Sequence, residues 1–127
     1  MKRAALLDAS FLIDLERETA GRVVGPARTF LPRLRGRPIA ISVVTVAELL
    51  EGAADESQTL QSLHRFSIQG LHAAQAQRWA RLRRRASQRM SENDAWLVAT
   101  ADSIDADVVG ADRAAFDRLG SRYLRFR

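Results

Sequence analysis

Four acidic residues stand where a carboxylate could do chemistry. Asp8 and Asp112 each follow a short apolar run typical of a buried strand, whereas Glu48 and Asp94 interrupt helical patterns that are otherwise apolar. A carboxylate that points towards a core needs hydrogen bonds or a metal ion to compensate its burial. Carboxylate oxygens are the ligands that Mg²⁺ and Mn²⁺ prefer, so the four together could hold such an ion and activate water for attack on a phosphodiester.

Each of these acids also has a purely structural explanation. Asp8 and Asp112 suit the N-cap of a following helix, and residues 91–94 resemble a capping box in which Asp94 bonds back to the cap. Glu48 fits a partly exposed helical position. Taken singly, none of the four identifies a catalytic site. If they converge, each close pair repels by about 4 kcal/mol at an effective dielectric of about 20, so one stays protonated unless a cation binds.

The elements that would position these acids alternate between strand and helix. Apolar runs predict strands at residues 4–7, 39–42, 66–68, 107–110 and 123–126. A 3.6-residue periodicity predicts helices at 9–18, 27–34, 45–54, 57–65, 72–89, 91–104 and a short helix ending at 119. The alternation predicts an α/β fold: a single domain over residues 1–127, with a mainly parallel central sheet flanked by helices. Ligands of such sheets bind at the carboxyl ends of the strands, where Asp8 and Asp112 are expected.

The composition favours a polyanionic or acidic partner and excludes several kinds of site. The net charge is +5 and Lys2 is the only lysine, so arginine, whose planar guanidinium suits phosphate, carries the excess. A GC-rich coding sequence explains the lack of lysine equally well. Cysteine is absent, which excludes disulfides, thiolate metal sites and thiol catalysis. No apolar run is long enough to span a bilayer and the apolar start ends at Asp8, so we expect no membrane partner, no export and a cytoplasmic location.

The order and spacing of four short motifs give the chain a family resemblance. Asp8-Ala9-Ser10 resembles the Asp-x-Ser/Asn motif that opens PIN-domain nucleases, and Thr45-Val46-Ala47-Glu48-Leu49 resembles their Thr-x-x-Glu-Leu helix. Residues 93–101 are similar to the third block, an Asp followed by an Ala-rich apolar helix. Residues 108–116 are similar to the last block, a strand followed by Thr-x-Asp and a phenylalanine. The ordered set spans nearly the whole chain and most resembles the VapC-type toxins of bacterial toxin–antitoxin pairs.

The resemblance implies a metal-dependent endoribonuclease that leaves a 5′-phosphate. Its catalytic residues and its ligands for Mg²⁺ or Mn²⁺ would be Asp8, Glu48, Asp94 and Asp112. Asp8 would anchor the main ion, Asp94 and Asp112 would complete its shell, and Glu48 would bind a second ion or orient the attacking water. Ser10 would hydrogen-bond a carboxylate or the scissile phosphate, or cap a helix. The resemblance also implies a cognate VapB-type antitoxin, whose tail fills the acidic pocket, and a homodimer.

Two departures from the family pattern bear on metal and substrate. Gly110 stands where a threonine or serine is usual, two residues before the fourth acid, so a hydroxyl that would support the cluster is missing. The stretch before Asp94 carries Arg83-Arg84-Arg85, where glycine and small residues are common. We expect these changes to affect substrate preference and the binding of a second ion, but they remove none of the four carboxylates.

The arginine-rich helix before Asp94 has two explanations. Arg84, Arg85 and Arg89 could form a phosphate-binding rim beside the site, or a solvated face paired with acids on neighbouring elements. We favour the substrate-binding rim, because Asp94 follows only five residues after Arg89.

The aromatic and histidine residues outside the motifs are assigned to structure. Trp79 and Trp96 could stack on nucleic-acid bases, but their apolar spacing favours packing in the core. His64 and His72 fall in no motif, so we expect them at the surface or at helix ends rather than on a metal.

Other classes of protein fit these residues less well. A phosphorelay receiver domain needs a late lysine, and Lys2 is the only lysine. A phosphatase with an Asp nucleophile needs Asp-x-Asp at the first strand, where Ala9 and Ser10 follow Asp8. The strongest alternative is a PIN-like module that binds RNA or a protein with weak or no catalysis. Only the retention of all four acids argues against it.

Overall fold

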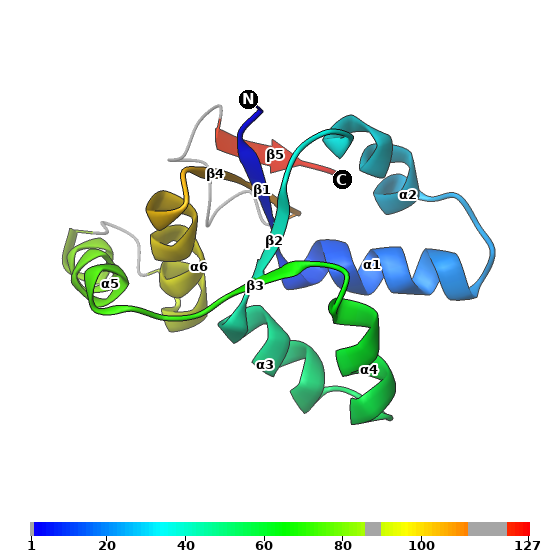
Figure 1. Cartoon of the computed structure of the whole chain (residues 1–127), viewed down its shortest axis with the longest axis horizontal. Coiled ribbons are helices and arrows are strands. Elements are labelled where there is room, and N and C mark those ends of the chain that lie inside the picture. The colour runs from blue at the N-terminus through cyan, green and yellow to red at the C-terminus, as the bar shows by residue number, and fades with distance from the viewer. Residues whose placement is uncertain (1, 86–89, 112–121) are drawn as a thin grey trace.

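Five parallel strands form the central sheet. The computed structural model describes residues 2–85, 90–111 and 122–127. Within them the strand order is β3-β2-β1-β4-β5 and every neighbouring pair is parallel (Figure 1). The bounds are β1 (Ala4–Leu7), β2 (Ile39–Ser42), β3 (Ser67–Gln69), β4 (Ala106–Gly110) and β5 (Tyr123–Arg125). The predicted α/β fold with a parallel sheet is therefore confirmed.

The described helices lie close to where the apolar periodicity predicts them. They are α1 (Ala9–Ala20), α2 (Pro26–Phe30), the 3₁₀ helix η1 (Leu31–Leu34), α3 (Val43–Glu51), α4 (Glu56–Leu63), α5 (Ala73–Arg85) and α6 (Glu92–Ser103). The helix predicted at 27–34 is divided into α2 and η1, because Pro32 has no N–H to continue an α-helix. α3 begins two residues early because the Ser42 hydroxyl caps it, accepting from the Val44 N–H at 3.1 Å. Residues 86–89 and the predicted helix ending at 119 lie outside the described residues.

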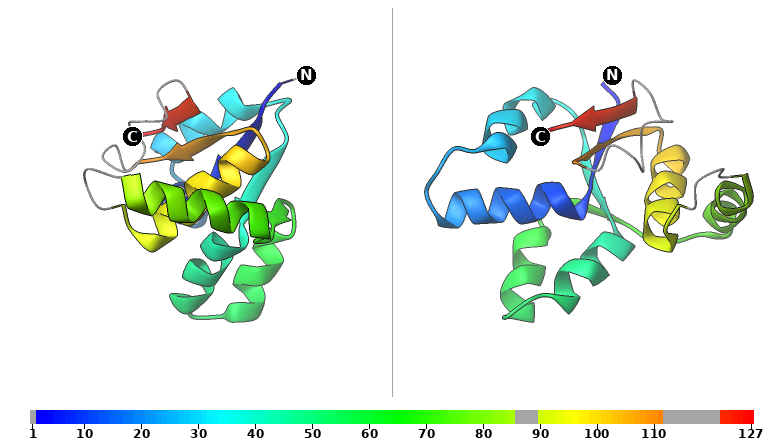
Figure 2. Two further views of the ribbon diagram at one scale, coloured as in Figure 1. Left: turned by 90° about the vertical axis from the view of Figure 1, so that its left-hand side faces the viewer. Right: turned by 180° about the vertical axis from the view of Figure 1, so that it is seen from behind.

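Helices cover both faces of the sheet, each over its own apolar core (Figures 1 and 2). One core joins the sheet to α1, α2, η1, α3 and α4, and the other joins it to α5 and α6. Along β1, Ala5 and Leu7 belong to the first core and Leu6 to the second, because successive strand residues point to opposite faces. In the described part of the chain, no helix combines the length and apolar character needed to cross a membrane.

A buried carboxylate joins α1 to α2. Glu18, near the end of α1, accepts hydrogen bonds from the backbone N–H groups of Gly25 (2.9 Å), Ala27 (3.0 Å) and Arg28 (2.8 Å). Burial alone would raise the pKa of Glu18, but these three bonds and the Arg28 charge outweigh it and lower the pKa below 4.5. Glu18 thereby satisfies the free N–H groups at the start of α2 and fixes the α1–α2 corner.

The order in which strands are added to the sheet reverses at β1, so that β1 and β4 lie side by side at a switch point. β2 and β3 extend from one side of β1, and β4 and β5 extend from the other. The carboxyl ends of β1 and β4 are therefore adjacent, with Leu7 beside Val109. A crevice at such a switch point is the usual ligand site of an open α/β sheet, and Asp8 lies there.

Candidate active site

Asp8 is held where β1 passes into α1. Its backbone N–H donates to the Val109 carbonyl of β4 at 2.9 Å. Its Oδ1 accepts from the Ala9 N–H at 2.7 Å, and its Oδ2 accepts from the Ser10 hydroxyl at 3.2 Å. Asp8 is the N-cap of α1, as the structural explanation expects. The side chain is only partly buried, so capping leaves it accessible to a ligand.

Ser10 and Gly110 bring Asp8 against the end of β4. The Ser10 Oγ accepts from the Ala111 N–H at 3.3 Å while it donates to Asp8, so one hydroxyl links the two strand ends. A Cβ atom on Gly110 would lie 3.1 Å from the Asp8 Oδ2 and 3.3 Å from the Asp8 Cβ, closer than ordinary van der Waals contact. Glycine at this position therefore lets the Asp8 side chain approach the end of β4 closely, whereas the family pattern has a residue with a hydroxyl group here.

Glu48 of α3 and Asp94 of α6 lie near Asp8. α3 and α6 contact each other, and the Asn93 side chain hydrogen-bonds the Glu48 carboxylate between them. Asp94 is close enough to Asp8 and to Glu48 to act on both electrostatically. The Asp94 N–H donates to the Ser91 hydroxyl at 3.1 Å, so Ser91 caps α6 and fixes where Asp94 begins the helix. Three of the four predicted acids are thus brought together from separate elements.

The surroundings of Asp8 favour its protonated form. Burial raises the pKa of Asp8 from 3.8 to about 6, against the lowering effect of the bonds from Ala9 and Ser10. The neighbouring charges of Asp94 and Glu48 contribute smaller parts of this rise. With a pKa of about 6 this carboxyl group takes up a proton more readily than an ordinary aspartate, and at pH 7 its charge would be compensated by a bound cation.

Glu48 shows the same tendency although its residue is more exposed. Partial burial of the carboxyl group raises the pKa of Glu48, the Asn93 hydrogen bond lowers it, and repulsion from Asp94 and Glu51 raises it again. Two carboxyl groups with raised pKa values and a third acid beside them form an arrangement that a bound cation would relieve.

The donor chemistry of the site fits a hard divalent ion. Asp8, Glu48 and Asp94 offer only carboxylate oxygens, the ligands that Mg²⁺ and Mn²⁺ prefer. Among the described residues, no three acidic or histidine side chains form a ready-made ligand set. The fourth predicted acid, Asp112, lies outside the described residues.

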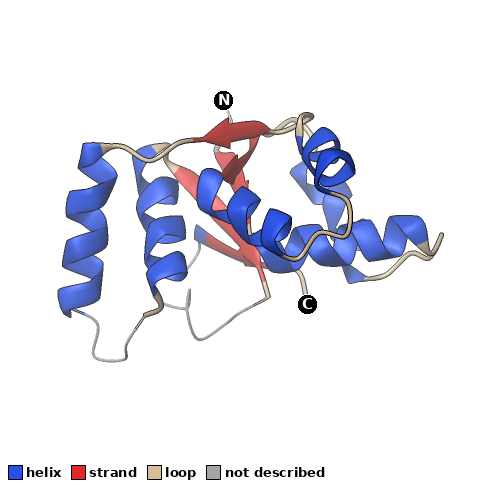
Figure 3. Cartoon of the chain, turned by 90° about the horizontal axis from the view of Figure 1, so that it is seen from below, coloured by secondary structure: helices blue, strands red, loops and turns tan. Residues whose placement is uncertain are grey.

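The predicted phosphate-binding arginines lie at the end of α5. Arg84 and Arg85 are exposed in its last turn, and Arg89 lies outside the described residues. α5 runs beside α6, the helix that carries Asp94 (Figure 3). Arg83 donates to the Met90 carbonyl and so ties the end of α5 to the segment just before α6. His64 and His72 are exposed, as predicted.

The comparison with known families decides which family this fold belongs to. The model of the PIN domain family matches residues 5–121. The chain belongs to the PIN-domain family. PIN domains are generally nucleases and typically depend on divalent metal ions. No curated protein matches the sequence.

Solved structures similar to this PIN domain come from toxin–antitoxin systems. A toxin–antitoxin complex from Klebsiella pneumoniae matches with a TM-score of 0.76 at 25% identity, over 95% of this chain and 99% of the other. VapBC-5 from Mycobacterium tuberculosis matches with a TM-score of 0.63 at 27% identity, over 99% of each chain. FitAcB from Neisseria gonorrhoeae has a TM-score of 0.74 over 97% of this chain and 96% of the other, but at 19% identity it shows the shared fold alone.

Three groups at the site were not predicted from the sequence. The bond from Asn93 to Glu48 depends on how α3 and α6 meet, although Asn93 stands next to a predicted acid. The Ala111 N–H, which donates to Ser10, is a backbone group, so no residue type in the sequence could have indicated it. Gly110 is visible in the sequence as a missing hydroxyl, and only the structure adds that its lack of a Cβ accommodates the Asp8 carboxylate.

Proposed function

We propose that this PIN domain is a metal-dependent endoribonuclease and acts as the toxin of a toxin–antitoxin pair. One observation carries the nuclease proposal: Asp8, Glu48 and Asp94, from three separate elements, lie close enough to perturb one another. Clustered carboxyl groups with raised pKa values are typical of functional sites, because their repulsion and desolvation cost folding stability. The general nuclease activity of PIN domains supports the same reaction, and the toxin–antitoxin neighbours support the toxin role.

The proposed ligands of Mg²⁺ or Mn²⁺ are Asp8, Glu48, Asp94 and Asp112. Such an ion, when bound, lowers the pKa of a water molecule and stabilises negative charge on phosphate oxygens. Asp8 is the proposed anchor, because hydrogen bonds from Ala9 and Ser10 fix both of its oxygens. The more exposed Glu48 is proposed to orient the attacking water or a second ion. Since the Ser10 hydroxyl already serves Asp8 and the Ala111 N–H, we assign it to supporting the carboxylate rather than to the phosphate.

The proposed substrate is RNA, held partly through its backbone phosphates by Arg84, Arg85 and Arg89. Arg84 and Arg85 are exposed in the last turn of α5, where a polyanion could reach their guanidinium groups. The net charge of +5 favours the approach of such a substrate. Together these features give the acidic site a positively charged approach on the α5 side.

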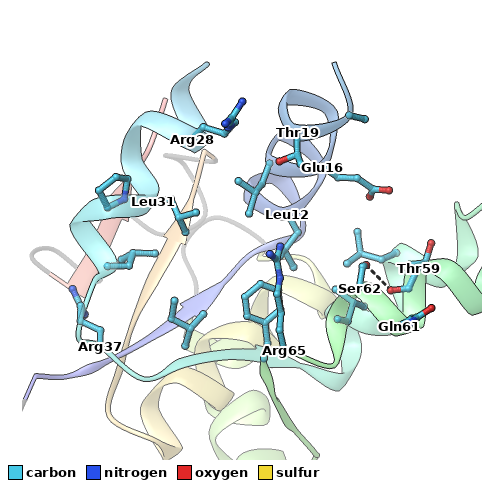
Figure 4. A pocket seen from close by; sticks show the side chains of 18 of the residues that line it. Leu12, Glu16, Thr19, Arg28, Leu31, Arg37, Thr59, Gln61, Ser62 and Arg65 are labelled. Atoms are coloured by element: carbon cyan, nitrogen blue, oxygen red, sulfur yellow. Dashed lines mark hydrogen bonds between the residues drawn. The ribbon is translucent and has the colours of Figure 1, made fainter. Parts of the chain in front are cut away.

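A groove on the other face of the sheet supports the proposal of a protein partner. It lies between α1, α2, η1 and α4, has a volume of about 1000 Å³, and is lined by none of the predicted acids (Figure 4). Leu12 and Leu31 line its apolar part, and Arg28 and Arg65 add positive charge, whereas the charge of Arg37 is paired with Asp107. A VapB-type antitoxin segment with apolar side chains and acidic neighbours would complement this surface. A homodimer stays a prediction from the family resemblance, and a cytoplasmic location stays a prediction from the sequence.

Incubation with RNA tests the nuclease proposal. The purified protein, freed of any antitoxin, is mixed with total RNA under EDTA, Mg²⁺ or Mn²⁺, beside Asp8→Ala and the exposed-acid control Glu56→Ala. We expect discrete cleavage with metal, none with EDTA or Asp8→Ala, and unchanged cleavage by Glu56→Ala. Folded wild type that binds RNA yet cuts nothing with either metal would instead support a binding module with an inactive site.

A further inference from the structure

Two tryptophans stack on each other where α5 meets α6. The ring centroids of Trp79 and Trp96 are 5.3 Å apart and the ring planes differ by 23°. Trp79 packs against the apolar core beneath these helices, as the sequence predicts, but Trp96 belongs to neither core cluster. Both residues are partly exposed. Core packing therefore accounts for Trp79, whereas Trp96 packs outside the core, against the Trp79 ring.

The inner tryptophan is held rigidly. The Trp79 Nε1–H donates to the Glu92 carbonyl at 3.1 Å. The Arg83 guanidinium lies 5.6 Å from the Trp79 ring centroid and also donates to the Met90 carbonyl. Trp96 thus stacks on a tryptophan that is already held in place. A base that stacked on the other face of Trp96 would therefore cost little side-chain entropy on binding.

Trp96 lies on α6, the helix that also carries Asp94. Trp96 follows Asn93 by three residues on α6, so the two side chains are neighbours on the helix surface. Asn93 in turn hydrogen-bonds Glu48. The same two helices carry the Asn93 amide, the aromatic pair, and Arg84 and Arg85 in the last turn of α5. Single-stranded nucleic acid is bound by this combination of stacking rings and cationic groups.

We propose that Trp96, supported by Trp79, is a base-stacking subsite for single-stranded RNA adjacent to the acidic site. This inference rests on the proposed function, because it names how the same site takes its substrate. A stacked base on Trp96 would position the strand so that a nearby phosphate reaches Asp8, Glu48 and Asp94. Stacking accepts any base, so the subsite contributes affinity and the position of the cut rather than sequence specificity.

Binding measured without cleavage tests the subsite. The probes are a fluorescein-labelled 12-nucleotide RNA of mixed A and C, and an oligomer with the same phosphates but no bases, both in EDTA. We expect wild type to bind the RNA roughly ten-fold tighter than the abasic oligomer. Trp96→Leu should lose that preference, Trp96→Phe should keep most of it, and Val24→Ser, which removes a distant exposed apolar residue, should match wild type.

Intrinsic fluorescence gives a second measurement. Trp79 and Trp96 are the only two tryptophans, so Trp79→Phe leaves Trp96 as the sole reporter. We expect the RNA to quench this variant strongly and the abasic oligomer to quench it little. Weak quenching by both oligomers would overturn the proposal even if Trp96→Leu failed to fold.

The outcomes separate the subsite from the nuclease. If wild type cuts RNA with Mg²⁺ and folded Trp96→Leu keeps the full preference for bases, the subsite is wrong and the nuclease stands. If wild type prefers bases in EDTA but cuts nothing with metal, the subsite stands and the nuclease is wrong. If Trp96→Leu keeps the preference but lowers the mass in sedimentation equilibrium from dimer to monomer, the aromatic pair serves a second copy of the chain, and the RNA proposal is overturned.

Discussion

Replacing Asp8 by asparagine should stabilise the metal-free protein at neutral pH. The side chain keeps its shape and can still accept the Ala9 N–H, but it no longer carries a charge beside Asp94 and Glu48. Most single substitutions of a hydrogen-bonded residue destabilise a fold, so a gain in stability here would be diagnostic of an acid held against its preference.

The magnitude follows from the pKa of Asp8. Folding raises this pKa from 3.8 to about 6, a difference of roughly 2 units. Each unit corresponds to about 1.36 kcal/mol, so ionised Asp8 lowers the free energy of unfolding at pH 7 by up to about 3 kcal/mol. Because the pKa is raised in the folded state, the stability linked to Asp8 is fully present below pH 3.8 and is lost as the pH rises through 6.

Thermal unfolding at several pH values measures this effect. In EDTA at pH 7.5, Asp8→Asn should melt on the order of 10 °C above wild type, and the difference should shrink towards pH 4. Saturating Mn²⁺ should raise the melting temperature of wild type and leave that of Asp8→Asn nearly unchanged. Glu16→Gln, which removes one exposed carboxylate from the same helix, should change stability by less than about 0.5 kcal/mol at any pH.

The opposite result has a clear meaning. If Asp8→Asn melts at or below the wild-type temperature across this pH range in EDTA, Asp8 is an ordinary helix cap. The electrostatic argument for the site would then be refuted, whatever the catalytic activity of the protein.

Three other substitutions probe separate parts of the account. Gly110→Ala should weaken Mn²⁺ binding and destabilise the fold by about 1–3 kcal/mol, because its Cβ crowds the Asp8 carboxylate; unchanged Mn²⁺ affinity and melting would contradict this. Glu18→Gln should lower the melting temperature at pH 7 more than Glu56→Gln does. The gap should close at low pH, since Glu18 has a lowered pKa and its contribution disappears as it becomes protonated; a constant gap would argue against the buried cap. Changing both Arg84 and Arg85 to glutamine should reduce the slope of log affinity for single-stranded RNA against log salt by about 1.4, and an unchanged slope would remove them from the interface.

Much of the fold could be predicted because its signals are local. β1 and β4 are buried on both faces, so they appear in the sequence as short apolar runs, and Asp8 is conspicuous as the acid that ends one of them. Ser42 and Ser91 mark the starts of α3 and α6 by capping them, although only Ser91 was expected to do so. The convergence of Asp8, Glu48 and Asp94 could be anticipated from the family motifs, but no residue spacing alone places α3 beside α6.

The features that could not be predicted depend on contacts between distant elements. Periodicity predicts that both Trp79 and Trp96 pack in the core. Only Trp79 does so, because Trp96 lies on the part of α6 that faces α5 and stacks on the Trp79 ring. The bond from Asn93 to Glu48 and the approach of Gly110 to Asp8 likewise exist only once the chain is folded. Local patterns predict elements and caps, whereas the geometry of a site is decided by packing.

Manganese binding measured by electron paramagnetic resonance tests the central claim most directly, because it reports the ion site without requiring a substrate. Wild type should bind Mn²⁺ and release it to Mg²⁺. Asp8→Asn and Asp94→Asn should each weaken the binding at least roughly ten-fold, as expected for lost ligands, and the control Glu56→Gln should not. A folded wild type that binds no Mn²⁺, or variants that bind it as wild type does, would contradict the proposal that these carboxylates form a metal-dependent nuclease site.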